Sequence, residues 1–286
     1  MNKFLILDGA VGTQLDKYNV SLQLPIWSAN ANIYFPEIVT KIHKEYISAG
    51  ADIITTNTFR STPYTYKKAG LSGIKAQSYA KNSFFKAFDC AHHAIKNNIK
   101  IAGSITSVDD CYSPKKFPGK MAAQDTYGQV IEWFGQCEID IIIFETMGNI
   151  CEIKIALDSV ISIDKPIWIS LIMKNKDTLL DGTSIEKTLN LIDSYDIDLL
   201  LINCNNIDLS IHIFKSIYSI RKLDLGLYPN LGFKEYNNSL SDIIDDYKLE
   251  LYIKSILNLK PSVVGLCCGS SPSHIKLLKS LIKEYK

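Results

Sequence analysis

The run Val263-Val264-Gly265-Leu266-Cys267-Cys268-Gly269 combines β-branched residues with two adjacent thiols near the C-terminus. A continuous apolar run of this kind is typical of a strand that is covered on both faces. A similar run, Leu199-Leu200-Leu201-Ile202-Asn203-Cys204, ends in a third thiol. Strands buried on both faces are typical of parallel sheets, so the two runs favour an α/β fold. If both belong to one sheet, their three sulfur atoms can converge at one edge.

The same unit recurs along the whole chain: a short β-rich run, a turn, and a stretch with helical spacing. The eight predicted strands are Phe4–Leu7, Asp52–Thr55, Lys100–Ser104, Asp140–Phe144, Ile167–Ile172, Asp198–Ile202, Leu225–Tyr228 and Ser262–Leu266. The eight predicted helices are Pro36–Ala49, Ile74–Lys96, Met121–Cys137, Ile150–Ile161, Ser184–Asp193, Leu209–Lys222, Leu240–Asn258 and Pro272–Lys283.

Eight such units in 286 residues match the (β/α)8 barrel in number and size. A doubly wound open sheet is the alternative. It usually has fewer strands, and no Gly-x-Gly-x-x-Gly motif follows the first predicted strand. No low-complexity linker divides the chain. We therefore predict an α/β fold with a single (β/α)8 TIM barrel and one domain over residues 1–286.

The composition is that of an ordinary soluble globular protein, with 47% hydrophobic and 21% charged residues. A formal net charge of +1 gives no electrostatic argument for binding nucleic acid or a membrane surface. No apolar run is long enough to span a bilayer, and the one at the N-terminus is too short for a signal peptide. We therefore expect a cytoplasmic protein whose partners are small-molecule substrates. Its oligomeric state stays open.

The seven cysteines form no Cys-x-x-Cys pair, and a chain of this size does not need disulfide bonds to be stable. Cys90, Cys137 and Cys151 lie in predicted helices, and Cys111 lies in a predicted loop. For these four we expect a packing role.

The chemistry of a (β/α)8 barrel lies at the C-terminal ends of its strands. The residues at those ends are Asp8, Thr55-Thr56-Asn57, Ser104, Glu145-Thr146, Met173-Lys174, Asn203-Cys204, Pro229-Asn230 and Cys267-Cys268. Two carboxylates and three thiols would thus surround one mouth. The histidines fall on predicted helices, where we expect packed or solvated side chains, and His274 is the one nearest to this mouth.

Three thiolates with an open fourth position describe a catalytic zinc site. Such a site carries a net charge of −1, so it activates water poorly. It would, however, hold a substrate thiol in its deprotonated, nucleophilic form. The arrangement favours alkyl transfer to sulfur over hydrolysis.

The alternative is that Cys267 and Cys268 are two small residues packed on opposite faces of a central strand. Both can face one metal only if the strand has ended, and Gly269-Ser270-Ser271-Pro272 offers such an end. The spacing alone leaves both interpretations open.

Several motifs resemble those of the homocysteine S-methyltransferase family, which includes betaine–homocysteine and S-methylmethionine-dependent enzymes. They are Leu7-Asp8-Gly9-Ala10 with Gly12-Thr13, Trp27-Ser28-Ala29, Gly50-Ala51-Asp52, Thr56-Asn57-Thr58-Phe59, Glu145-Thr146, Asp181-Gly182-Thr183, Asn203-Cys204, Tyr228-Pro229-Asn230, Cys267-Cys268-Gly269, Ser271-Pro272 and His274-Ile275. The likeness covers nearly the whole chain. Leu201 and Leu266 stand where the family usually has glycine, which bears on the shape of the pocket.

The resemblance implies that Cys204, Cys267 and Cys268 bind Zn2+ and act in catalysis through it. It also implies that Asp8 and Glu145 accept hydrogen bonds from the ammonium group of homocysteine. Trp27 would line the side of the methyl donor, because an aromatic face attracts a sulfonium or quaternary ammonium group.

The implied function is zinc-dependent transfer of a methyl group from a small cationic donor to the homocysteine thiolate, which gives methionine. S-methylmethionine and S-adenosylmethionine are the favoured donors. The sequence does not decide between them, nor between homocysteine and another thiol or selenol. Two alternatives remain: a Schiff-base lyase that uses Lys174, and a non-catalytic module that binds zinc or homocysteine.

Overall fold

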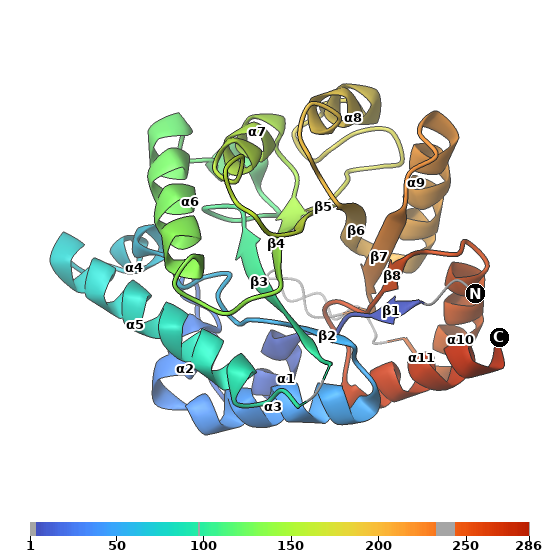
Figure 1. Cartoon of the computed structure of the whole chain (residues 1–286), viewed down its shortest axis with the longest axis horizontal. Coiled ribbons are helices and arrows are strands. Elements are labelled where there is room, and N and C mark those ends of the chain that lie inside the picture. Colours follow the sequence, from blue (N-terminus) through green and yellow to red (C-terminus); the bar gives the residue numbers. More distant parts are fainter. Residues whose placement is uncertain (1–3, 97, 233–243, 286) are drawn as a thin grey trace.

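Eight parallel strands form a closed ring. The computed structural model describes residues 4–96, 98–232 and 244–285. Its strands pair in the order β1-β8-β7-β6-β5-β4-β3-β2 (Figure 1). The first and second strands close the ring, because Leu7 forms a parallel bridge with Ile53 and the amide of Asp8 donates to the Ile53 carbonyl at 3.0 Å. The predicted (β/α)8 barrel is confirmed.

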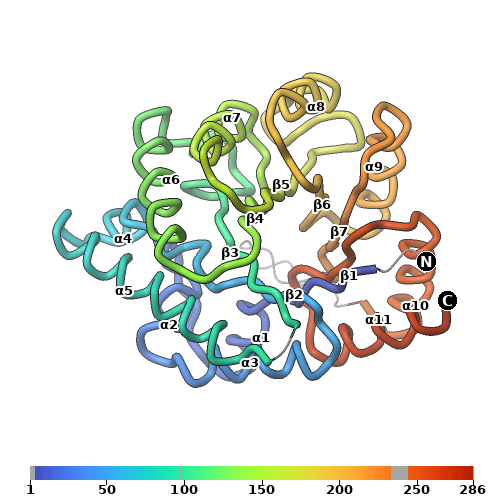
Figure 2. Tube along the Cα trace, in the orientation of Figure 1, coloured from blue at the N-terminus to red at the C-terminus, as the bar shows by residue number. Residues whose placement is uncertain are grey.

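The strands are β1 (Leu5–Ile6), β2 (Ile53–Thr55), β3 (Lys100–Thr106), β4 (Ile141–Met147), β5 (Ile167–Leu171), β6 (Leu199–Asn206), β7 (Leu225–Asn230) and β8 (Val263–Val264). The helices are α1 (Val11–Lys17), α2 (Ala29–Tyr34), α3 (Pro36–Ala49), α4 (Pro63–Lys68), α5 (Gly73–His92), α6 (Lys120–Phe134), α7 (Ile150–Asp158), α8 (Ile185–Ile192), α9 (Ile207–Ile220), α10 (Asp246–Leu257) and α11 (Pro272–Glu284). They surround the strands as an outer layer, which the tube in Figure 2 traces.

All eight predicted strands and eight predicted helices have counterparts, with differences at their ends. The short helices α1, α2 and α4 were not predicted. Strands β3, β4, β6 and β7 extend past their apolar runs into polar residues, because backbone pairing continues there. The predicted helix Leu240–Asn258 begins at Asp246 in the structure, and residues 240–243 lie outside the described residues.

Apolar side chains form two layers, one inside the barrel and one between the strands and the helices. Leu201 belongs to the inner layer and is fully buried. Gly226 makes room for it, since a Cβ on Gly226 would lie 2.9 Å from Leu201 Cδ2. Leu266 is buried in the outer layer, together with side chains of the surrounding helices. Both leucines that replace the usual glycines are therefore absorbed by the core.

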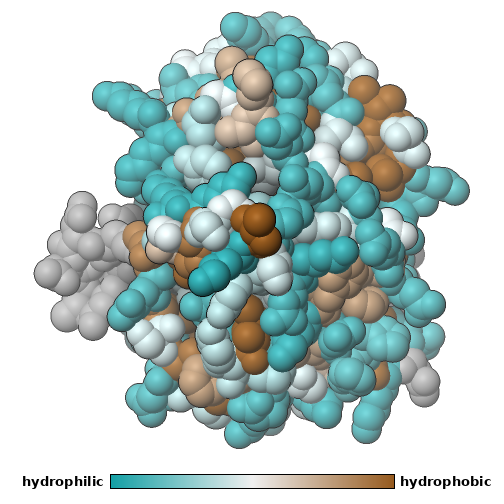
Figure 3. Space-filling view, turned by 90° about the vertical axis from the view of Figure 1, so that its left-hand side faces the viewer, coloured by the Kyte–Doolittle hydropathy of each residue, from teal (hydrophilic) through white to brown (hydrophobic). Residues whose placement is uncertain are grey.

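Hydrophilic residues cover most of the face drawn in Figure 3, where hydrophobic residues form separate small groups. Within the described ranges, no helix is both long enough and apolar enough to cross a membrane.

Candidate metal centre

Three thiols meet at the mouth of the barrel. The Sγ atoms of Cys204, Cys267 and Cys268 all lie within 4.8 Å of one another. Cys268 Sγ is 3.7 Å from Cys204 Sγ and 4.0 Å from Cys267 Sγ. Sulfurs bound tetrahedrally at ~2.3 Å from zinc lie about 3.8 Å apart, so the donor atoms and their spacing fit this metal. No other cluster of three metal-binding side chains occurs in the part of the chain that the structure describes.

A local irregularity in β6 places Cys204. The backbone of Cys204 is left-handed, with φ 55°, and the pairing of β6 with β7 shifts register between Asn203 and Asn206. Thr146 on β4 has the same conformation, with φ 58°. The Asn203 side chain joins the two sites: its Oδ1 accepts from the Thr146 amide at 3.0 Å and its Nδ2 donates to Thr146 Oγ1 at 2.8 Å. Bulges of this kind re-aim a side chain.

A turn after β8 places the other two thiols. The Cys267 amide still donates to the Pro229 carbonyl of β7 at 2.8 Å, and the Ser270 amide then donates to the Cys267 carbonyl at 3.1 Å. Gly269 has φ 82°, and its amide donates to Thr13 Oγ1 at 3.1 Å. The strand has therefore ended at the cysteine pair, which removes the objection that adjacent strand side chains face opposite ways.

The thiols also influence one another's protonation. Contacts with Cys204 and Cys267 lower the pKa of Cys268 well below its usual value, although burial opposes them. Contacts with Cys204 and Cys268, together with burial, raise the pKa of Cys267. One thiolate, on Cys268, is thus favoured before any metal binds. A bound cation would displace the remaining protons.

Asp8 and Glu145 lie at the same end of the barrel. The Asp8 carboxylate follows β1 and accepts from the Thr55 amide at 3.0 Å and from Thr55 Oγ1 at 3.1 Å. Glu145 on β4 accepts from Ser104 Oγ at 3.1 Å. Burial raises the pKa of Glu145 to about 7, and burial together with the charge of Glu145 raises that of Asp8. The two carboxylates repel each other, so a cation between them would be stabilised.

Trp27 is half-buried beside α1. Its backbone is left-handed, with φ 54°, and its amide donates to the Gln23 carbonyl at 2.6 Å. A Cβ on Gly12 would lie 3.0 Å from Trp27 Nε1, so the indole packs on the helix that follows Asp8. Its role toward a methyl donor stays a prediction.

Two other candidates do not join the centre. His274 Nε2 lies 3.8 Å from Asp246 Oδ1, and His274 is not part of the thiol cluster. Lys174 is exposed after β5, in a loop closed by its amide and the Thr178 carbonyl.

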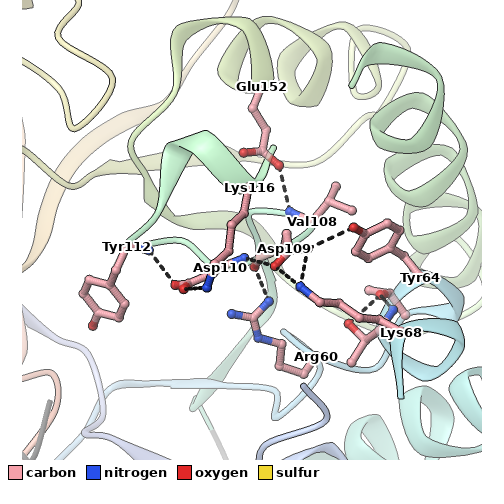
Figure 4. A network of polar contacts seen from close by, with 11 residues as sticks. Arg60, Tyr64, Lys68, Val108, Asp109, Asp110, Tyr112, Lys116 and Glu152 are labelled. Carbon is pink, nitrogen blue, oxygen red and sulfur yellow. Dashed lines mark hydrogen bonds and ion pairs between the residues drawn. The ribbon is translucent and has the colours of Figure 1, made fainter. Parts of the chain in front are cut away.

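Sequence reasoning missed Tyr112. Its hydroxyl donates to Cys204 Sγ at 3.2 Å, although 43% of the residue is exposed. The loop after β3 carries it, and Figure 4 shows how that loop is fastened. Asp110 accepts from the Tyr112 amide at 3.1 Å and pairs with Lys116 at 2.9 Å. No motif marks this tyrosine, because its contact with β6 exists only once the barrel closes.

Tyr228 and Cys111 were also not assigned to the site. The Tyr228 hydroxyl is buried without a hydrogen-bond partner among the described residues, and burial together with the charge of Glu145 raises its pKa. Cys111, beside Tyr112, is buried, and burial raises its pKa to about 11.

The whole chain is similar to proteins of known activity. A family model described as homocysteine S-methyltransferase matches residues 5–282. Homocysteine S-methyltransferase 1 of Saccharomyces cerevisiae is 27% identical over 315 aligned residues, with 99% of this chain and 95% of the yeast protein covered. Selenocysteine methyltransferase of Astragalus bisulcatus is 23% identical, with 98% of this chain and 92% of that protein covered.

A solved structure shares the fold. The homocysteine methyltransferase MmuM of Escherichia coli, in its metallated form, matches with a TM-score of 0.81 at 23% identity, and the match covers 97% of this chain and 96% of that one. The family model spans the barrel from β1 to α11. This chain therefore belongs to the homocysteine S-methyltransferase family and is a methyltransferase.

Proposed function

We propose that this chain transfers a methyl group from S-methylmethionine or S-adenosylmethionine to the sulfur of homocysteine, with Cys204, Cys267 and Cys268 as ligands of a zinc ion. The observation that carries the proposal is the convergence of three sulfur atoms within 4.8 Å at the barrel mouth. A structural zinc site has four protein ligands, whereas three leave one position for a substrate.

When bound, zinc would lower the pKa of the homocysteine thiol enough to make it a thiolate at neutral pH. The protein supplies the rest by positioning. Asp8 and Glu145 would hold the ammonium group of the acceptor, so that its sulfur reaches the cluster. Tyr112 donates a hydrogen bond to Cys204 at 3.2 Å and would steady the orientation of that ligand.

The methyl group of a sulfonium donor carries partial positive charge, and transfer leaves a neutral thioether. Trp27 would present its ring face to this cation. Methyl transfer requires the acceptor sulfur, the methyl carbon and the leaving sulfur to lie in line. A barrel mouth that holds both reactants in this arrangement lowers the activation barrier of the transfer.

The test is methionine formation by the purified chain with each donor, with and without a chelator. We expect about one zinc per chain and loss of activity on chelation that added zinc restores. Cys268→Ala should lose both zinc and activity. The matched control is Cys151→Ala, an exposed cysteine outside the cluster, which should keep both. Methionine formation by Cys268→Ala with normal zinc content would contradict the proposal.

No observation favours the Schiff-base alternative, since Lys174 is exposed and lies outside the cluster. Membership of a methyltransferase family likewise argues against a module without turnover.

A further inference from the structure

Arg60 is a buried cation close to the mouth of the barrel. It follows β2 by a few residues and is only 8% exposed. One terminal nitrogen, Nη1, donates to the backbone carbonyl of Asp109 in the loop after β3. Nε is buried with no hydrogen-bond partner among the described residues, and none of these residues accepts from Nη2.

The carboxylates around Arg60 are already engaged by other donors. Asp109 accepts from Lys68 Nζ at 2.6 Å and from the Tyr64 hydroxyl at 2.9 Å. Glu152 accepts from the Val108 amide at 2.7 Å and from the Tyr127 hydroxyl at 3.0 Å.

In the described part of the chain, Arg60 forms no direct ion pair with a carboxylate within 4.0 Å, although its charge counteracts the burial that raises the pKa of Glu152. A buried guanidinium without a direct ion pair is unfavourable, and proteins normally pair it.

The free atoms of Arg60 lie on one edge of its guanidinium. Nε and Nη2 form the side of the planar group that binds both oxygens of a carboxylate at once. Figure 4 shows the Nη1 end directed at Asp109, and the other terminal nitrogen directed away from Lys68, toward the side on which Tyr112 lies. Tyr112 is the residue whose hydroxyl contacts the thiol cluster.

We propose that Arg60 recognises the carboxylate of an amino acid bound in the barrel mouth, through Nε and Nη2. The inference rests on the proposed function, in which the acceptor and the donor S-methylmethionine are both α-amino acids. Their ammonium groups suit the carboxylates of Asp8 and Glu145, but those two residues would repel a carboxylate. Arg60 supplies the complementary charge. The carboxylate could come from the acceptor or from the donor.

The test removes the carboxylate from the ligand and the guanidinium from the protein in turn. Affinities of the zinc-loaded chain are measured by calorimetry for two pairs: homocysteine with 3-mercaptopropylamine, and S-methylmethionine with (3-aminopropyl)dimethylsulfonium. In one pair, we expect the wild-type chain to bind the carboxylate-bearing ligand at least about 10-fold more tightly. Arg60→Gln should remove that preference and leave the other ligand within about 3-fold of its original affinity. The pair that responds identifies the source.

Arg60→Lys keeps the charge but not the planar edge, so it should restore part of the preference. Lys116→Gln is the matched control. It removes a cation of the same loop that is paired with Asp110, so Asp109 stays engaged by Lys68, and it should leave the preference unchanged.

Two results would overturn the assignment. One is equal affinity of the wild-type chain for both members of each pair, which needs no variant. The other is an equal loss for both members in Arg60→Gln, as expected if Arg60 only braces the loop at Asp109. In either case, methionine formation by the wild-type chain would leave the proposed function standing. If the chain makes no methionine but keeps the Arg60-dependent preference, the proposed function fails, whereas the role of Arg60 in binding a carboxylate stands.

Discussion

At the residue scale, the hydrogen bond from Tyr112 to Cys204 can be removed by deleting one atom. Tyr112→Phe keeps the ring of this residue, which is 43% exposed as a whole, and removes the donor that lies 3.2 Å from the sulfur. Groups that orient a metal ligand typically contribute about 10- to 100-fold to metal affinity. We therefore expect zinc to bind about 10-fold more weakly in Tyr112→Phe, measured by competition with a chromophoric chelator.

Tyr64→Phe serves as the control for that experiment. It also removes a tyrosine hydroxyl near the same loop, but this hydroxyl donates to Asp109 at 2.9 Å instead of to a thiol. Zinc affinity should not change. Equal weakening in both variants would mean that the loop as a whole, and not the contact with Cys204, stabilises the centre.

Glu145 should make amino acid binding depend on pH. Burial raises its pKa from the usual value near 4.5 to about 7, so the free protein carries a neutral carboxyl below pH 7 and a carboxylate above it. Only the carboxylate can form a charge-assisted bond with an ammonium group. The affinity for methionine should therefore rise from pH 5.5 through about pH 7 in calorimetric titrations, and Asp8, whose pKa burial also raises, contributes to this rise.

Methionine is the right probe because it has the ammonium group but no thiol whose ionisation would add its own pH dependence. Glu145→Gln should bind methionine more weakly and show a smaller rise near pH 7, because Asp8 is then the one carboxyl of the pair that remains. A wild-type affinity that is flat over this range would show that Glu145 does not face the ammonium group.

At the scale of elements, the turn after β8 depends on Gly269. Its φ of 82° is unfavourable for other residues, and a Cβ there would lie 2.6 Å from the Gly232 carbonyl oxygen. Gly182 has a similar φ of 89° with open space around its Cβ position. Gly182→Ala should thus cost about 1–2 kcal/mol for conformation alone. Gly269→Ala should cost more and also lower zinc content, because the turn that carries Cys267 and Cys268 must shift.

Urea denaturation and zinc analysis of both variants test this expectation. If Gly269→Ala and Gly182→Ala lose the same stability and both retain zinc, the close approach of Gly269 to Gly232 has no consequence for the centre.

The strands and helices could be predicted from the sequence better than the local backbone conformations that position the site residues. Continuous apolar runs located all eight strands, because burial on both faces leaves an unmistakable pattern. The helix predicted over Pro36–Ala49 has these same bounds in the structure, and Gly50 follows it with φ 116°, a conformation that favours glycine at a helix end. The left-handed backbone at Thr146 and Cys204 has no such mark. It depends on the Asn203 side chain bridging two strands that are distant in sequence.

Among the side chains at the mouth, too, some positions could be predicted from the sequence and others depend on tertiary contacts. Asp8, Glu145 and the three cysteines follow strands directly, so the barrel topology alone predicts that they gather there. Tyr112 reaches the mouth from the loop after β3, and Arg60 lies in the segment after β2, where its Nη1 donates to the Asp109 carbonyl. Their significance lies in what they contact or fail to contact, and neither a hydrogen bond to a thiol nor an unpaired guanidinium is visible in a sequence.

At the scale of the whole molecule, the thiol cluster connects β6 and β8, two strands that flank β7 in the barrel. Cys204 lies within the irregularity of β6, the cysteine pair follows β8, and Thr13 of α1 accepts a hydrogen bond from the Gly269 amide. A cation that binds these thiols in the folded chain stabilises the barrel by an amount that grows with the logarithm of its concentration. Removing it should therefore lower the melting temperature of the whole domain, and not only loosen one loop.

We expect thermal unfolding of the zinc-loaded chain to occur in one transition, since residues 1–286 are predicted to form a single domain. Each kcal/mol of metal linkage corresponds to a shift of about 2–4 °C for a domain of this size. A chelator should thus lower the melting temperature by several degrees in the wild-type chain and in Cys151→Ala, but not in Cys268→Ala, which begins without zinc. Calorimetric scans would contradict this if two transitions appear, or if chelation leaves the wild-type midpoint unchanged, because the thiol cluster would then not couple β6 to β8 through a metal.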